Sequence, residues 1–106
     1  MKSFRIKIKS EALSDILEAT DWYNERLPKL GTRFQKVVKQ QINILKYSAN
    51  NHSIRYDQVH CMLIHKFPFM VHFIIDELNF VFEIFAIIHT SRNPEIWEQR
   101  NKIFKN

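Results

Sequence analysis

The spacing of apolar residues changes once along the chain, and this change limits the folds that the chain can adopt. From Ser10 to Ser48, apolar residues recur every three or four positions, which is the period of a helix with one buried face. From Val59 to His89, short runs rich in Phe, Val and Ile are typical of strands. Helices followed by strands predict an α+β domain.

The N-terminal segment alternates strictly between apolar and basic residues. These residues are Phe4, Arg5, Ile6, Lys7, Ile8 and Lys9. A period of two predicts a strand with one apolar face and one basic face. Such a strand is either a sheet edge protected by charge or a surface that binds a partner, and the pattern is compatible with both.

Two helices are predicted next, with a break between them at Pro28 and Gly31. Ser10 is a candidate cap for the first. Its expected buried face comprises Leu13, Ile16, Leu17, Thr20 and Tyr23. The expected buried face of the second comprises Leu30, Phe34, Val37, Gln41 and Ile44 or Leu45. We expect these helices to form an antiparallel hairpin that covers one face of the sheet and leaves the other partly open.

After a polar break at Ser48–His52, three strands are predicted at 59–67, 69–76 and 80–89, with a fourth strand possible. Asp76–Asn79 has the composition of a hairpin turn, so we expect an antiparallel meander. Pro94 opens a short last helix for which Asn93 is a candidate cap, and Trp97 is expected to pack that helix onto the sheet.

Length and composition limit the class of protein. The 106 residues correspond to one domain, and a single Cys, Cys61, excludes an internal disulfide framework. We expect a reducing, cytoplasmic setting, because no signal peptide is recognisable and the apolar stretches are too short to span a membrane. The formal net charge of +5 favours nucleic acid or an acidic protein as partner.

No cofactor, metal or small-molecule substrate is predicted. The five histidines, which include His52 and His60, lack the spacing of metal ligands. Gly31 is the only glycine, which excludes glycine-rich nucleotide-binding loops.

Four segments together resemble the RelE/ParE toxin superfamily. They are the helical residues 12–23, the turn 28–34, the segment Lys66-Phe67-Pro68-Phe69 and the nonapeptide from His89 to Trp97. The resemblance extends over nearly the whole chain, 1–106. It implies a RelE-like fold, in which an N-terminal helical hairpin packs on a small twisted antiparallel sheet and a short helix ends the chain.

The resemblance also implies a partner and a cellular target. Toxins of this superfamily are held inactive by a cognate antitoxin, for which we expect an acidic, DNA-binding protein encoded beside the toxin. RelE-like members cut mRNA on the ribosome, whereas ParE-like members inhibit DNA gyrase by protein–protein contact.

If the chain is RelE-like, the candidate catalytic residues are Arg55, Lys66, His89 and Arg92, since phosphate chemistry needs cations and a proton carrier. A local role for His89 in the turn after the last strand is equally compatible with its position. The scarcity of cations on the middle strands, and Trp97 where several nucleases place Tyr or His, favour the ParE-like alternative. A degenerate, non-toxic member is the third reading.

A partner-binding surface is predicted from the basic strand and from the end of the sheet. Its candidate residues are Arg5, Lys7, Lys9, Arg92 and Trp97.

Overall fold

A computed structural model of the chain describes residues 4–48 and 54–105. The elements are β1 (Arg5–Ile8), α1 (Ser10–Arg26), α2 (Leu30–Ser48), β2 (Ile54–Tyr56), β3 (Val59–Leu63), β4 (Phe69–Asp76), β5 (Val81–His89) and α3 (Pro94–Lys105). The predicted order of strand, two helices, strands and helix is confirmed. Most of the predicted break at Ser48–His52 lies outside the described residues.

The strands form one sheet in the order β1-β5-β4-β3-β2. The predicted antiparallel meander is confirmed for β2 to β5, and β3 ends at Leu63 rather than at Phe67. The expectation of a wholly antiparallel sheet is wrong, because β1 pairs with β5 in parallel. Apolar alternation in residues 4–9 looks the same in either direction of pairing, so the sequence pattern does not encode this difference.

The long hairpin of β4 and β5 is the centre of the sheet. Its turn is the predicted one, and the Asp76 carboxylate accepts hydrogen bonds there from the backbone and side-chain nitrogens of Asn79. Partway along the hairpin the register shifts: His72 pairs with Ala86, and Phe73 pairs with Ile84. Phe85 is therefore the extra residue of a β-bulge, and β5 bends at this residue.

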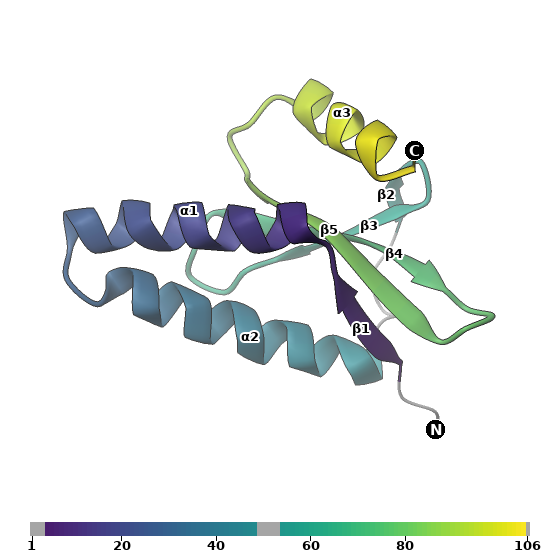
Figure 1. The fold of residues 1–106 in the computed structure, drawn as a ribbon, viewed down its shortest axis with the longest axis horizontal. Coiled ribbons are helices and arrows are strands. Elements are labelled where there is room, and N and C mark those ends of the chain that lie inside the picture. The colour runs from purple at the N-terminus through teal and green to yellow at the C-terminus, as the bar shows by residue number, and fades with distance from the viewer. Residues whose placement is uncertain (1–3, 49–53, 106) are drawn as a thin grey trace.

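Both faces of the sheet carry apolar clusters. The larger cluster joins the helical hairpin of α1 and α2 to one face through residues such as Phe34, Val38 and Phe82. The smaller one joins α3 to the other face, where Ile96 and Trp97 pack with buried residues of β3 and β5. In Figure 1, α2 and α3 lie on opposite sides of β5, and α3 lies close to the N-terminal part of α1. The predicted α+β class is confirmed.

The first helix differs from its prediction in two respects. Ser10 begins α1, and its hydroxyl donates to the Glu11 carboxylate instead of capping the helix. Ile16 is half-buried and Tyr23 is buried as expected, but Leu13 and Leu17 are 47% and 58% exposed. Burial of both leucines was therefore predicted wrongly.

The break between the helices is made by Lys29, which has a positive φ of 71°, rather than by Gly31. Gly31 lies inside α2, where its backbone nitrogen donates to the Asn24 side-chain oxygen at 2.7 Å. A β-carbon on Gly31 would lie 2.1 Å from the carbonyl oxygen of Thr20. This glycine is therefore needed for the close approach of α1 and α2.

The start of α3 is as predicted. Asn93 Oδ1 accepts a hydrogen bond from the Glu95 backbone nitrogen at 2.9 Å, which is the contact of a helix cap. Trp97 packs α3 onto the sheet, also as predicted. Among the described residues, no helix is both long enough and apolar enough to cross a membrane.

Candidate functional site

A cleft of about 850 Å³ opens between α1, the turn that joins β3 to β4, and the loop that joins β5 to α3. We call it the α1–β5 cleft. Its lining consists of Asp15, Glu18, Ala19, Trp22, Tyr23, Leu30, Lys66, Phe67, Pro68, Phe69, Ile87, Ile88, His89, Ser91, Arg92, Ile96 and Arg100.

Three of the four candidate catalytic residues line this cleft, namely Lys66, His89 and Arg92. Lys66 has a positive φ of 68° in the β3–β4 turn, and Arg92 follows β5. Arg55 lies elsewhere: it lines a separate cavity beside Cys61, and its guanidinium carbon is 5.8 Å from the centre of the Trp97 ring.

Hydrogen bonds fix the loop that carries His89 and Arg92. The Thr90 nitrogen donates to the Pro68 oxygen at 2.8 Å, which ties this loop to the β3–β4 turn. The Ser91 nitrogen donates to His89 Nδ1 at 3.0 Å, and the Arg92 nitrogen donates to the His89 oxygen, also at 3.0 Å. His89 thus has the local role in the turn that the sequence suggested. Because Nδ1 accepts a hydrogen bond, the neutral imidazole carries its proton on Nε2.

Aromatic side chains form the apolar part of the cleft. The Tyr23 ring lies 5.2 Å from the Phe67 ring, and the His89 ring lies 5.1 Å from the Phe69 ring. Burial raises the pKa of Tyr23 above its ordinary value, so this phenol stays protonated at neutral pH. Trp22 at the rim is 50% exposed, and the guanidinium carbon of Arg26 lies 3.3 Å from the centre of its ring.

Asp15 and Arg100 line the cleft as an ion pair. Asp15 accepts two hydrogen bonds from Arg100, at 3.1 and 2.9 Å, and a third from the Ile87 backbone nitrogen at 2.9 Å. Their ion pair leaves Lys66 and Arg92 as the cleft cations without an ion-pair partner among the described residues. The role of Arg100 leaves no signal in the sequence, because 85 positions separate this residue from Asp15.

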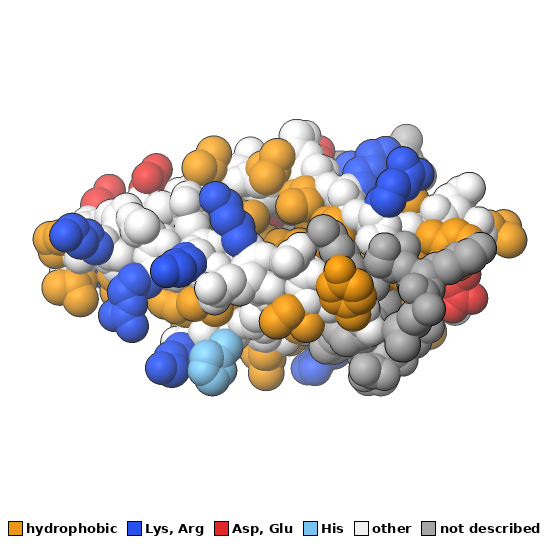
Figure 2. Space-filling model, turned by 90° about the horizontal axis from the view of Figure 1, so that it is seen from below, with side chains coloured by type: hydrophobic (Ala, Val, Ile, Leu, Met, Phe, Trp, Pro, Cys, Tyr) orange, Lys and Arg blue, Asp and Glu red, His pale blue; other side chains and the backbone are white. Residues whose placement is uncertain are grey.

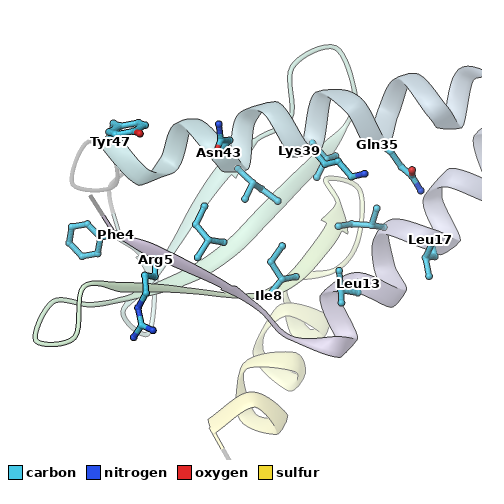
Figure 3. A pocket seen from close by; sticks show the side chains of 13 residues that line it. Phe4, Arg5, Ile8, Leu13, Leu17, Gln35, Lys39, Asn43 and Tyr47 are labelled. Carbon is cyan, nitrogen blue, oxygen red and sulfur yellow. The ribbon is translucent and has the colours of Figure 1, made fainter. Parts of the chain in front are cut away.

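A second hollow, of about 1030 Å³, lies between β1, α1 and α2, and we call it the apolar groove. Figure 3 shows Ile8, Leu13 and Leu17 on one side, with Gln35, Lys39, Asn43 and Tyr47 along α2. The two exposed leucines of α1 are thus explained by their position in this groove. Its described lining includes the cations Arg5 and Lys39 and no carboxylate.

The predicted partner-binding residues do not form a single surface. Arg5 and Lys7 are exposed on β1, at the edge of the sheet, and Lys9 is half-buried just after it. Arg92 lines the α1–β5 cleft, whereas Trp97, a residue of α3, lies half-buried between that helix and the sheet. Figure 2, seen from the side of α2, shows Lys and Arg among hydrophobic side chains, with Asp and Glu at the margins of this face.

Within residues 4–48 and 54–105, no group of three or more potential metal-ligating side chains is found. Cys61 is half-buried beside His72, with Sγ 3.4 Å from Nδ1. Burial raises the pKa of the Cys61 thiol to about 11, so the thiolate is scarce at neutral pH.

The fold built from this sheet, the helical hairpin and the last helix is shared with solved structures of ParDE and RelE proteins. The chain is similar to a structure of the chromosomal ParDE toxin–antitoxin system from P. aeruginosa, with a TM-score of 0.74, 18% identity, and coverage of 84% of this chain and 98% of that one. It is also similar to a free mutant of E. coli toxin RelE, with a TM-score of 0.68, 12% identity, and coverage of 97% and 98%.

An archaeal RelE–RelB complex from Pyrococcus horikoshii gives a TM-score of 0.58 at 13% identity, and the match covers 86% of this chain and 99% of that one. No family model matches the sequence, and no curated protein matches it either. The predicted RelE-like fold is confirmed by these structures.

Proposed function

We propose that the protein is the toxin component of a type II toxin–antitoxin system, held inactive by a cognate antitoxin. The observation that carries this proposal is the fold, which matches structures of a ParDE system, a RelE toxin and a RelE–RelB complex over most of each chain. Fold alone does not determine function, so the two surfaces of this chain must support the assignment as well.

The apolar groove is the proposed antitoxin-binding surface. Leu13, Leu17 and Tyr47 line it and are 47%, 58% and 68% exposed, which leaves apolar area that a partner would bury. Because Arg5 and Lys39 border the groove without a carboxylate, it is suited to a segment with one apolar and one acidic side.

The edge strand next to the groove extends this surface. The Arg5 nitrogen donates to the Phe80 oxygen just before β5, and the Lys9 nitrogen donates to the Ile84 oxygen. The backbone groups of the alternate residues Ile6 and Ile8 therefore face away from β5. An extended part of the antitoxin can pair with this edge, with acidic side chains beside Arg5 and Lys7. An acidic antitoxin would also associate quickly with a chain of net charge +5.

For the cellular target, we propose ParE-like inhibition of DNA gyrase by protein contact. The α1–β5 cleft supports this choice, because two of its groups that could accept a proton, the Asp15 carboxylate and His89 Nδ1, are already hydrogen-bonded. Asp15 is held by Arg100 and by the Ile87 nitrogen, and His89 Nδ1 is held by Ser91. The Trp97 side chain is half-buried between α3, to which it belongs, and the sheet.

The alternative is a ribosome-dependent mRNA endoribonuclease that needs no metal. Its support is the convergence of Lys66, His89 and Arg92 on one cleft, where two cations could stabilise a phosphate and His89 Nε2 could donate a proton. A non-toxic member that only binds its antitoxin is the remaining possibility.

Induction of the protein in growing bacteria separates these functions. A gyrase inhibitor should induce the DNA-damage response and filamentation while translation continues. Early translation arrest with cleaved mRNA would instead support the nuclease. Unchanged growth at a confirmed level of soluble protein would contradict the toxin assignment.

A further inference from the structure

We propose that the α1–β5 cleft binds a segment of the target protein in which an acidic side chain neighbours an aromatic or aliphatic one. This inference rests on the proposed function, and it names the chemistry that the cleft recognises. The cleft offers two kinds of contact side by side: exposed hydrogen-bond donors and an apolar floor.

The donors come from the turn and the loop at one end of the cleft. Lys66 and Arg92 are exposed and have no ion-pair partner within the described parts of the chain. His89 adds a third donor, because the hydrogen bond from the Ser91 nitrogen to Nδ1 places the imidazole proton on Nε2. A carboxylate has two acceptor oxygens and can accept hydrogen bonds from several such donors.

The apolar floor comes from α1, from the β3–β4 turn and from the start of β4. Phe67 and Phe69 are half-buried, so part of each ring faces the cleft. Trp22 is 50% exposed at the rim, and Arg26 lies over its ring and holds it in place. Aromatic and arginine side chains of this kind are enriched in the residues that dominate binding at protein interfaces.

The charge of the lining favours protein over RNA. Among its described residues, three cations are accompanied by two carboxylates, Asp15 and Glu18. Asp15 is bonded to Arg100, which therefore contributes little positive field. A nucleic acid carries a phosphate at every nucleotide and would meet the Glu18 carboxylate, whereas one acidic side chain needs only the end with Lys66 and Arg92.

Titrations followed by NMR of the ¹⁵N-labelled full chain test this proposal. The probes are two acetylated and amidated hexapeptides, Gly-Leu-Phe-Asp-Leu-Gly and the same peptide with Asn in place of Asp, and the RNA hexamer of adenylate. The Asp peptide should shift the backbone signals of Thr90 and Arg92 and the Trp22 indole signal. It should bind at least threefold more tightly than the Asn peptide.

Two variants assign the preference to the cleft. Arg92→Gln should reduce the ratio of the affinities for the Asp and Asn peptides to less than 1.5-fold. Arg33→Gln, on the exposed surface of α2, should leave this ratio unchanged. Equal affinities for the two peptides would overturn the proposal, as would shifts confined to the apolar groove. Tighter binding of the RNA at the cleft would assign the site to nucleic acid instead.

Toxicity in cells and neutralisation by the antitoxin are measured separately from these titrations. A toxic, neutralisable protein whose cleft does not discriminate between the peptides would retain the proposed function and lose this inference. A harmless protein whose cleft prefers the Asp peptide would contradict the proposed function and retain this inference.

Discussion

Arg100 of α3 forms a two-point ion pair with Asp15 of α1. Together these side chains hydrogen-bond the backbone of β5 along the part of its edge that β1 does not cover. β1 pairs with β5 only as far as Ile84. Beyond that point Arg100 donates to the Phe85 oxygen at 3.0 Å, and Asp15 accepts from the Ile87 nitrogen at 2.9 Å. The ion pair therefore takes the place of a further stretch of β1 and connects both helical layers to the central strand.

Removing one member of this pair should destabilise the fold. Both side chains are mostly buried, with 21% and 17% exposure for Arg100 and Asp15. Asp15→Ala leaves Arg100 without its ion-pair partner and the Ile87 N–H without an acceptor, so we expect a loss of about 2–4 kcal/mol in the free energy of unfolding. Urea denaturation measures this free energy. Asp21→Ala, at an exposed position of the same helix, should change stability by less than about 0.5 kcal/mol. Similar values for both variants would contradict this role.

Gly31→Ala should also destabilise the protein, although alanine normally favours a helix by roughly 1 kcal/mol over glycine. The new β-carbon would lie 2.1 Å from the Thr20 oxygen and 2.8 Å from the Asn24 side chain, so the helices must separate. We expect a net loss of about 1–3 kcal/mol, measured by thermal or urea unfolding. Thr32→Ala, at the exposed next position, is the matched control. A stabilised Gly31→Ala variant would show that the helices can adjust freely.

The stability of the protein should fall between pH 6.5 and pH 4 because of His72. This side chain is fully buried, and its Nδ1 lies 3.0 Å from the Tyr56 hydroxyl. Burial, followed by the charges of Arg100 and Arg55, lowers the pKa of His72 from 6.5 to about 4. The unfolded chain therefore binds a proton in this window that the folded chain excludes, which costs roughly 1.4 kcal/mol per pH unit and about 3 kcal/mol in total.

Urea denaturation at a series of pH values measures this loss. His72→Gln should flatten the slope between pH 6.5 and 4, whereas His65→Gln, at an exposed position, should retain it. An unchanged slope in His72→Gln would assign the acid sensitivity to other groups.

Much of the fold follows from local sequence patterns. The period change predicted the helices and the meander, and the composition of Asp76–Asn79 predicted the central turn. The parallel pairing of β1 did not follow, because it depends on where the chain returns after the helices. Leu13 and Leu17 were assigned to the core because a helical period identifies an apolar face without showing whether it is covered.

The candidate site was predictable to the extent that its residues lie in contiguous segments. Lys66 and His89 were identified within two such segments, and the fold brings them to one cleft. The contact of Asp15 with Arg100 joins residues 85 positions apart, and no spacing rule relates them. Arg55 was grouped with the cleft residues on chemical type alone, but it lies near Trp97 and lines a separate cavity.

Arg92→Ala should abolish toxicity while antitoxin binding remains measurable, because Arg92 lines the α1–β5 cleft and does not line the apolar groove. Growth after induction reports the first property, and co-purification with the product of the adjacent reading frame reports the second. Arg33→Ala serves as the control for loss of a surface cation. An undiminished growth defect in Arg92→Ala would remove this residue from the target-binding surface.

The central claim is that the antitoxin and the target bind two different surfaces, and Leu17→Asp in the apolar groove tests it most directly. Leu17 is 58% exposed, so the substitution should leave the fold intact, and Leu78→Asp at a 92% exposed position is the matched control. The measurement is the growth rate of cells that produce each variant together with the antitoxin. We predict that Leu17→Asp stops growth despite the antitoxin, whereas Leu78→Asp is neutralised like the unmodified protein. Full neutralisation of Leu17→Asp would contradict the assignment of the groove.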